Sequence, residues 1–474
     1  MLKEKKLFEH RRAFLRGAAQ VVLAAPFAAA GADALADTEH KMGNRRQTKS
    51  NDVQKSHIQL NVRDYGAAGD AKTKDTLALQ MTIERCSVLG GGEVIVPAGD
   101  YLTGALALRS NVLLRLEDGA TLNGSPEMAD YPVAQVRWEG RWIKGYSAMI
   151  YANDAENIGI VGPGKIVGSP AVKGRVNRET RMRLPALLEF VNCRNVRVEN
   201  CYTENFGMWS IHPTYCQDVT FRKVTVRSGA DGIDVDSCRN VTIDGCDFDT
   251  TDDCISLKSG RGAEGYALLR PTEDVRITNC SFRDKVWACI GIGSETSGGI
   301  RNVHVDNCKC LGAGTFAIYI KSRPGRGAFI ENIYMNNLEI SGAKLGFLRF
   351  NILNSGIADE YLVPGDEGIP TIRNFEFRNI KVTDEPVLVD GIAIHPHKPL
   401  DGFVLENVTG TCAKGITLAN VMNARISNVN VTGFQGPLFS IHNVTGKGLQ
   451  AAVQIDGPKI PDPIAPPAEP YKLH

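Results

Sequence analysis

The sequence predicts an all-β fold, a solenoid of the parallel β-helix type, and three observations lead to it. A short motif of alternating apolar and polar residues recurs along the chain, and alternation over a few positions is the periodicity of a strand. Successive copies start 22 to 42 residues apart, as expected when a coil of about 22 residues carries loops of variable length. No helical stretch of ten or more residues separates the copies, which argues against alternating strands and helices.

The repeated motif begins with Asn or Asp. β-Branched and aromatic residues fill its inward sites, and an Asn at its start suits a tight turn, where its amide can bond to the backbone or to the next Asn in a ladder. Each short strand would then pair with its counterpart one coil above. The copies span residues 195–201, 218–224, 240–246, 274–280, 302–308, 332–338 and 374–380.

The chain begins with a basic segment and an apolar run. Arg11 and Arg12 form a twin-arginine pattern, residues 21–30 are apolar, and residues 34–36 are a small-residue cleavage site. We expect residues 1–36 to be a twin-arginine signal peptide, and the mature protein to be periplasmic or secreted. The apolar run is too short for a stable membrane span, so no membrane partner is expected for the mature form.

The remaining elements follow in order. Residues 37–57 are polar and are predicted to be a flexible lead. Residues 76–89 have the apolar spacing of a short helix, which would cover the open N-terminal end of the solenoid, as such folds require. Strands are predicted at 93–97 and 101–106. We expect one β-helix domain over 58–450, and a Pro-rich tail over 451–474 because proline cannot extend a sheet.

Charge and cysteine usage exclude several classes of protein. The net charge is +1 over 474 residues, which gives no reason to expect a nucleic acid as partner. No spacing of Cys and His resembles a zinc site. Many of the 12 cysteines recur at one point of the motif, so we predict small apolar residues stacked inside the coils rather than a disulfide framework. Examples are Cys193, Cys201, Cys246, Cys280 and Cys308.

Three aspartates are the strongest candidates for function. Asp231 precedes Asp252 by 21 residues and Asp253 by 22, which is the length of one repeat. Because neighbouring strands lie about 4.8 Å apart, their carboxyl groups would come within reach of one another on adjacent coils. Crowded carboxylates raise the pKa of at least one member, and an acid beside an ionised carboxylate suits hydrolysis of a glycosidic bond. A separation of about 6.5–9.5 Å would leave room for water and give inversion.

Spacing alone leaves three classes of function open. The aspartates could hydrolyse a glycosidic bond, or they could act with Ca²⁺ in a polysaccharide lyase that abstracts a proton next to a carboxylate. They could also be turn residues of a carbohydrate-binding solenoid. Lys258, on the same strand as the aspartate pair, and Lys321, further along, could neutralise an anionic sugar.

Around these residues the chain resembles the polygalacturonase family of glycoside hydrolases, family 28. Residues 231–234 match the family's Asn-Thr-Asp-Gly-Ile-Asp block, and residues 252–260 match its Gly-Asp-Asp block. The resemblance runs from about Asn61 to beyond Asn430, and flanking matches resemble bacterial exo-type members. These flanks are residues 137–140, 209–213 and 292–295.

The resemblance implies a right-handed β-helix that inverts the anomeric centre and needs neither a cofactor nor a metal. It makes Asp252 the general acid, and it makes Asp231 and Asp253 the residues that hold and activate water. The expected partner is a plant cell-wall-type polysaccharide or oligosaccharide of the pectic class. The resemblance leaves exo or endo action open.

Two elements of the family pattern are missing from this chain. Trp287 occupies the position of the histidine in the Gly-His-Gly block, and Tyr319 replaces the arginine of the Arg-Ile-Lys block. Both aromatic side chains offer flat stacking surfaces, which favours a sugar other than plain polygalacturonate, such as a rhamnogalacturonan-type substrate. A weakly active or inactive homologue is the alternative. Two further candidates are His212, which could line the substrate cleft or pack internally, and Arg323, which could bind uronate carboxylates.

Overall fold

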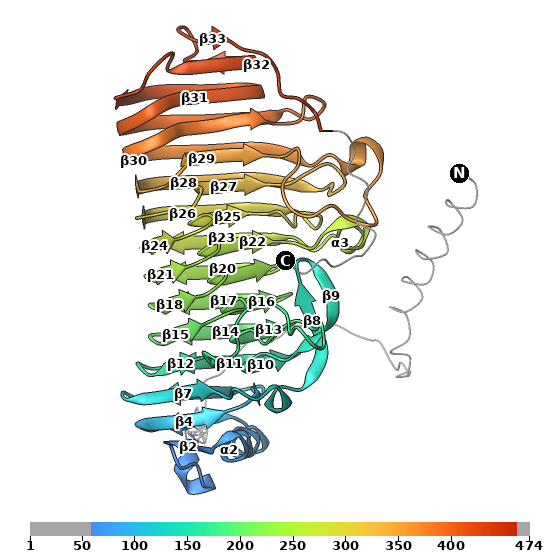
Figure 1. Cartoon of the computed structure of the whole chain (residues 1–474), viewed down its shortest axis with the longest axis vertical. Coiled ribbons are helices and arrows are strands. Elements are labelled where there is room, and N and C mark those ends of the chain that lie inside the picture. Colours follow the sequence, from blue (N-terminus) through green and yellow to red (C-terminus); the bar gives the residue numbers. More distant parts are fainter. Residues whose placement is uncertain (1–57, 462–474) are drawn as a thin grey trace, which may run out of the picture. The chain divides into compact units, whose positions relative to one another are not determined.

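The computed structural model describes residues 58–461, which lie within one compact unit (Figure 1). The predicted parallel β-helix is confirmed: 31 strands of the described residues form one hydrogen-bonded sheet, in which every pairing is parallel. The predicted signal peptide at 1–36, the lead at 37–57 and the tail from 462 onward lie outside the described residues. Within 58–461, no helix is long and apolar enough to cross a membrane.

Each coil contributes up to three strands, which stack into three ladders. Ladder A, which positions the candidate site, consists of β5 Leu106–Ala107, β10 Ile150–Asn153, β13 Leu188–Val191, β16 Ile211–Thr214, β19 Ile233–Asp236, β22 Ile255–Lys258, β25 Ile290–Ile292, β27 Phe316–Lys321 and β29 Gly346–Asn351.

Ladders B and C form the other two sides of the coil. Ladder B consists of β1 Gln59–Asn61, β3 Gly92–Val96, β6 Val112–Leu116, β11 Glu156–Val161, β14 Arg194–Glu199, β17 Gln217–Arg222, β20 Arg239–Asp244, β23 Thr272–Thr278, β26 Ile300–Cys310 and β28 Phe329–Ser341. Ladder C consists of β2 Asp70–Lys74, β4 Gly99–Thr103, β7 Ala120–Gly124, β12 Lys165–Val167, β15 Tyr202–Asn205, β18 Thr225–Ser228, β21 Asp247–Thr250 and β24 Ser281–Asp284.

The repeats aligned in the sequence pair in the same register in ladder B. The valines at one motif position stack directly above one another, from Val196 through Val219 and Val241 to Val275 and Val303. These side chains are buried, because every second residue of a strand points into the coil. The register confirms that each repeat is one coil.

The recurring Asn has a conformational reason. Asn302, Asn332 and Asn374 all have φ of +57°, in the left-handed region that Asn tolerates better than most residues. The side-chain amide of Asn332 donates to Asn302 over 3.1 Å, and that of Asn374 donates to Asn332 over 2.9 Å. The predicted Asn ladder is therefore present, and it fixes the turn at the same place in each coil.

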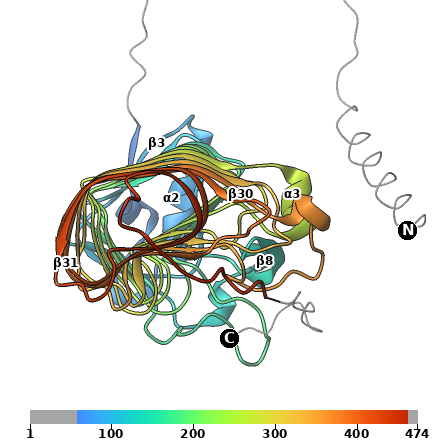
Figure 2. The same ribbon diagram turned by 90° about the horizontal axis from the view of Figure 1, so that it is seen from above.

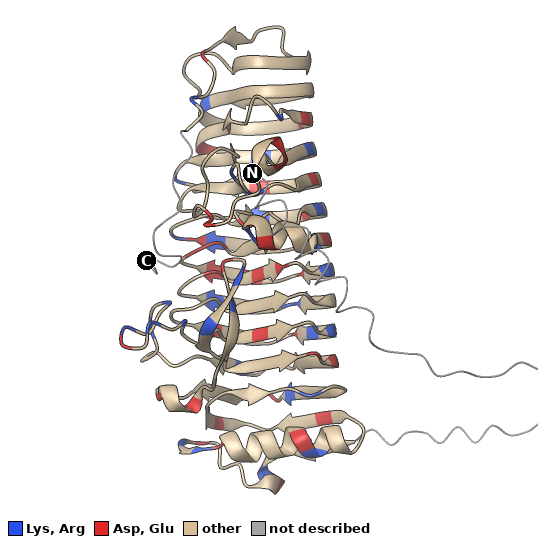
Figure 3. Cartoon of the chain, turned by 90° about the vertical axis from the view of Figure 1, so that its right-hand side faces the viewer, with Lys and Arg blue, Asp and Glu red and all other residues tan. Residues whose placement is uncertain are grey.

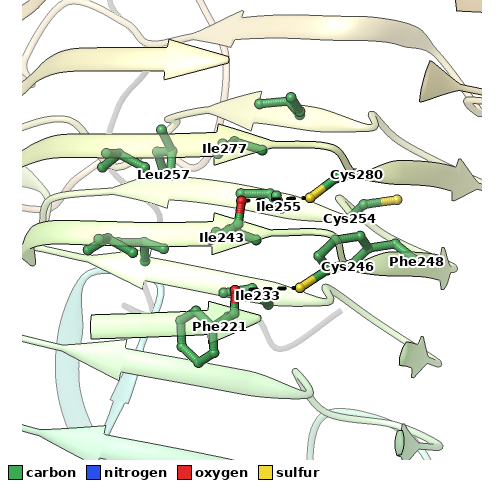
Figure 4. Close-up of a cluster of buried hydrophobic side chains, with 14 of the residues drawn as sticks. Phe221, Ile233, Ile243, Cys246, Phe248, Cys254, Ile255, Leu257, Ile277 and Cys280 are labelled. Atoms are coloured by element: carbon green, nitrogen blue, oxygen red, sulfur yellow. Dashed lines mark hydrogen bonds between the residues drawn. The ribbon is translucent and has the colours of Figure 1, made fainter. Parts of the chain in front are cut away.

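The interior of the coils is filled by aliphatic, aromatic and cysteine side chains (Figure 4). All 12 cysteines are buried and free, as predicted. The thiol of Cys246 donates to the carbonyl oxygen of Phe221 over 3.7 Å, and that of Cys280 donates to Ile243 over 3.8 Å. Each thiol thus serves as a small apolar residue with a weak donor.

The two ends of the stack are built differently. Helix α2, Thr76–Val88, contacts β1, β3, β5 and β6, and lies across the end of the coils in Figure 2. The predicted capping helix is therefore confirmed. At the other end, long strands follow the coil round its corners, and the ladder continues to β33, past the expected boundary at residue 450. These strands are β30 Thr371–Ala393, β31 Leu400–Thr432, β32 Phe439–Lys447 and β33 Val453–Gln454.

Three excursions leave the coil on the side of ladder A. They are the antiparallel hairpin of β8 Val133–Trp138 and β9 Arg141–Tyr146, the helix α3 Gly262–Leu268, and the loop 352–370 (Figure 2). The fully buried Asp359 of that loop joins all three, because it pairs with Arg261 at 3.1 Å, Arg326 at 3.0 Å and Arg141 at 3.6 Å. Short 3-10 turns complete the structure: η1 Val62–Tyr65, η2 Met128–Asp130 and η3 Gly365–Gly368.

Acidic and basic residues are intermixed on the face of the stack that Figure 3 shows. Figure 3 shows acidic and basic residues side by side at the ends of the strands, with no wide region of one sign on this face. The distribution agrees with the near-zero net charge of the whole chain.

Candidate active site

The three aspartates come together where ladder C passes into ladder A. Asp231 lies between β18 and β19, and Asp252 and Asp253 lie between β21 and β22, one coil above. The backbone amide of Gly232 donates to the carbonyl oxygen of Asp253 over 3.0 Å, which holds the two turns in register. One carboxylate oxygen from each aspartate lies within 4.8 Å of the other two.

Asp253 is held by donors on both carboxylate oxygens. Its Oδ1 accepts from the backbone amide of Ala288 over 3.1 Å, and its Oδ2 accepts from the Ser256 hydroxyl over 2.8 Å. The ammonium group of Lys321 pairs with the same Oδ2. Three donors fix the orientation of this side chain.

Asp231 is held by a second buried ammonium group. The Nζ of Lys258 lies 3.2 Å from Asp231 Oδ2 and also pairs with the fully buried Asp234. Burial alone would raise the pKa of Asp231, but Lys258, Arg175 and Lys321 hold it below its ordinary value. Burial and the charge of Asp231 raise the pKa of Asp234 well above its ordinary value. Asp231 is therefore the carboxylate of this pair that ionises first.

Asp252 differs from its two neighbours. Burial, followed by the charges of Asp231 and Asp253, raises its pKa to about 7, although Arg175 and Lys321 oppose this rise. Its Oδ2 forms an ion pair with the guanidinium group of Arg175. A carboxyl group that still holds a proton near neutral pH, beside two carboxyl groups that are paired with lysines, is equipped to act as a general acid.

The spacing of the trio differs from the expected one. Oxygens within 4.8 Å are closer than the roughly 6.5–9.5 Å that is usual for inverting hydrolases. Oxygens at this spacing could also surround a cation. However, Lys258, Lys321 and Arg175 each place a positive charge against one of the aspartates, and these charges would repel a divalent ion. The charge balance thus favours a proton on Asp252 over a metal ion among the three carboxylates.

Lys321 connects the trio to the two aromatic candidates. Its Nζ lies 5.9 Å from the centre of the Trp287 ring and 5.6 Å from that of Tyr319. Trp287 is 42% exposed, whereas Tyr319 is only 7% exposed and its ring lies against Arg349. Only Trp287 therefore offers an open stacking face. Ala288, the residue after Trp287, contacts Asp253 through its backbone amide. Because position 287 is Trp and position 288 is Ala, neither of them places a histidine side chain beside the trio.

His212 and Arg323 have internal partners. His212 is buried, its Nδ1 lies 3.3 Å from Glu189, and its Nε2 lies 3.2 Å from the Thr214 hydroxyl. Arg323 donates to the carbonyl oxygen of Gly356 over 2.6 Å and is nearly buried. Both side chains hold neighbouring segments in place, which agrees with the packed alternative for His212.

Four residues near the trio were not identified as candidates from the sequence. Arg175 lies in an insertion and carries no motif, so only the fold reveals its contact with Asp252. Asp234 and Ser256 lie inside the two sequence blocks that match the family. Each is the second residue of a ladder A strand, and this shared position could have identified them as neighbours of the aspartates. Glu139, in the turn between β8 and β9, pairs with Arg261 at 3.3 Å. This contact joins the hairpin to the segment before α3, so only the fold reveals it.

Comparison with known proteins places the chain among families of known sequence. A sequence model of the family described as glycosyl hydrolases family 28 matches residues 86–384. A probable polygalacturonase of Vitis vinifera is 29% identical over 365 residues, which cover 73% of this chain and 73% of the relative.

Two solved structures have the same fold. The crystal structure of a hyperthermoactive exopolygalacturonase from Thermotoga maritima matches with a TM-score of 0.70 and 29% identity, over 79% of this chain and 92% of that one. A family 28 exopolygalacturonase from Yersinia enterocolitica matches with a TM-score of 0.68 over 85% of this chain and 79% of that one. At 21% identity, this second match is a likeness of fold.

Proposed function

This chain belongs to glycosyl hydrolase family 28 and is a glycoside hydrolase, and from that premise we propose that it cleaves galacturonate-containing pectic polysaccharide or oligosaccharide with inversion. The observation that carries the proposal is the trio of Asp231, Asp252 and Asp253, whose oxygens lie within 4.8 Å of one another. One member is poised to keep a proton, and the other two are paired with lysines.

In the proposed reaction, Asp252 donates its proton to the glycosidic oxygen as the bond from that oxygen to the anomeric carbon breaks. A water molecule held by Asp231 and Asp253 attacks the anomeric carbon from the opposite face. The proton that the water loses passes to one of these two carboxylates. Asp252 regains a proton from solvent, and the aspartates return to their starting state.

The short spacing of the trio makes retention the competing outcome, since retaining enzymes have carboxyl groups about 5–5.5 Å apart. Retention requires a carboxylate that bonds to the anomeric carbon. Both oxygens of Asp253 already accept hydrogen bonds, from Ala288, Ser256 and Lys321, and this weakens it as a nucleophile. The same donors suit a carboxylate that orients water, so they support inversion.

Lys321, Arg175 and Trp287 support an acidic sugar as substrate. Positive side chains beside the trio complement a uronate carboxylate, and the exposed Trp287 ring can stack on a sugar face. Tyr319, Lys258, His212 and Arg323 have less access to solvent, and we propose that they support the site from within. A backbone that alternates uronate and deoxysugar units, such as rhamnogalacturonan, suits this arrangement. Its deoxysugar can stack on the exposed Trp287 ring while its uronate meets the positive side chains.

The test is a screen of the wild type and of Asp252→Asn on polygalacturonate, methyl-esterified pectin and rhamnogalacturonan. The wild type is expected to release reducing sugar from at least one of them with or without a chelator. Proton NMR of the first product is expected to give the inverted anomer. Asp252→Asn is expected to lower kcat at least about 100-fold at an unchanged melting temperature. Unsaturated, ultraviolet-absorbing products that depend on Ca²⁺ would instead identify a lyase.

We also propose that residues 1–36 direct export of the folded protein by the twin-arginine pathway. Arg11 and Arg12 followed by an apolar run support this assignment. Replacing both arginines with lysine is expected to retain the precursor in the cytoplasm in a cell-fractionation experiment. Normal export of that variant would refute the assignment.

A further inference from the structure

A hairpin between β12 and β13 places an arginine against the proposed general acid. Val176 and Arg183 form an antiparallel bridge, and the amide of Leu184 donates to the carbonyl oxygen of Arg175 over 2.9 Å. At the hairpin's base, a Cβ on Gly207 would lie only 2.4 Å from the Gly174 carbonyl oxygen, so coil and hairpin meet backbone to backbone. The main chain at Arg175 is therefore fixed, while its side chain extends towards Asp252.

Arg175 is the most open of the three cations around the trio. Its side chain is 33% exposed, whereas those of Lys258 and Lys321 are 7% and 11% exposed. The two lysines are enclosed by the carboxylates that they neutralise. Arg175 reaches Asp252 through one guanidinium nitrogen, and a guanidinium group has five N–H donors in a planar fork that matches a carboxylate. It can therefore meet a second carboxylate that arrives from solvent.

We propose that Arg175 recognises the carboxylate of a uronate unit in the substrate, and that its transfer from Asp252 to this carboxylate releases the general acid for catalysis. The proposal rests on the proposed function, and it adds the residue that reads the acidic group of the substrate. In the free enzyme Arg175 screens the carboxyl group of Asp252. In the complex, the uronate takes over the positive charge.

The charged groups that face Asp252 determine in which direction its pKa changes when the substrate binds. Asp231 and Asp253 raise its pKa, and Arg175 and Lys321 lower it, while Glu139 faces Arg175 from the turn between β8 and β9. Neutralising Arg175 removes one of the two lowering charges. The pKa of Asp252 must then rise, so Asp252 keeps its proton to higher pH in the substrate complex than in the free enzyme.

The test compares wild type with Arg175→Gln and Arg175→Lys, and uses Arg178→Gln as the matched control. Arg178 is an exposed arginine of the same hairpin. Trigalacturonate binding, measured by calorimetry, is expected to weaken about tenfold in Arg175→Gln, less in Arg175→Lys and not at all in the control. Because calorimetry needs no turnover, it decides the proposal even if the wild type hydrolyses none of the pectic substrates.

The pH profile provides a readout that a purely structural residue would not move. In the wild type the alkaline limb of kcat is expected to lie above that of kcat/KM. In Arg175→Gln the alkaline limb of kcat/KM is expected to move up by about one pH unit and to coincide with that of kcat. Wild-type trigalacturonate affinity in Arg175→Gln, or an unmoved alkaline limb, would overturn the proposal. Circular dichroism establishes whether each variant is folded. If Arg175→Gln does not fold, Arg175→Lys, which keeps the positive charge but loses the planar fork, provides the test.

Discussion

Gly291 tests the geometry of the aspartate trio most directly. It lies in β25, in register between Ser256 of β22 and Tyr319 of β27. An alanine Cβ at this position would lie 2.2 Å from Asp253 Oδ2 and 2.9 Å from the Nζ of Lys321. Non-bonded contacts between carbon and oxygen are about 3.2 Å or longer, so the Asp253 carboxylate would have to retreat by about 1 Å.

A displacement of about 1 Å at a catalytic group can cost about 100-fold in rate, which corresponds to about 2.7 kcal/mol of transition-state stabilisation. The strand itself tolerates alanine, because Gly291 does not have a positive φ. We therefore expect Gly291→Ala to lose about 100-fold in kcat on its best pectic substrate, with a melting temperature within a few degrees of wild type.

Gly312→Ala is the matched control for this variant. It lies in the turn before β27, and a Cβ there would have no atom within 4 Å. Steady-state kinetics and thermal melting of both variants give the answer. If Gly291→Ala turned over like Gly312→Ala, the carboxylate of Asp253 would not need its observed position, and its assigned role would be wrong.

Two further predictions concern protons. The kcat/KM of the wild type is expected to fall as pH rises through about 7, because Asp252 then loses the proton that it must donate; a flat profile up to pH 9 would contradict its role. Asp284, which accepts a hydrogen bond from the backbone amide of Trp287, has its pKa raised to about 7 by burial. The folded state therefore holds a proton that the unfolded chain releases near pH 4, and stability falls between about pH 4 and 7. Asp284→Asn is expected to reduce this fall in melting temperature; an unchanged slope would show that Asp284 does not titrate there.

The fold was predictable because its determinants are local. Asn302 and Asn332 mark the turns through their left-handed backbone conformation, and Val241 and Val275 mark the interior through strand alternation. A period close to one coil then places Asp231 beside Asp253 without any knowledge of distant parts of the chain. The capping helix followed from the need to cover the open end of the first coil.

The parts that could not be predicted depend on contacts between distant segments. Arg175 reaches Asp252 across 77 positions of the sequence through an insertion hairpin. Tyr319 occupies an outward site of its strand, yet Arg349 from the next coil covers its ring, which no pattern within the motif reveals. The cations that pair with the trio, Lys258, Lys321 and Arg175, come from three separate segments of the chain, and a repeat length does not reveal them.

The buried thiols have a consequence for the compartment in which the protein works. Burial raises the pKa of Cys201 to about 12, so its reactive thiolate is scarce, and each of the 12 cysteines is buried. A chain that reached an oxidising environment unfolded would present 12 thiols to one another, and mispaired disulfides would lock its coils out of register. A chain that folds beforehand buries those thiols, so oxidants cannot contact them. In an oxidising environment, folding before exposure to oxidants would therefore protect the native stacking of the coils.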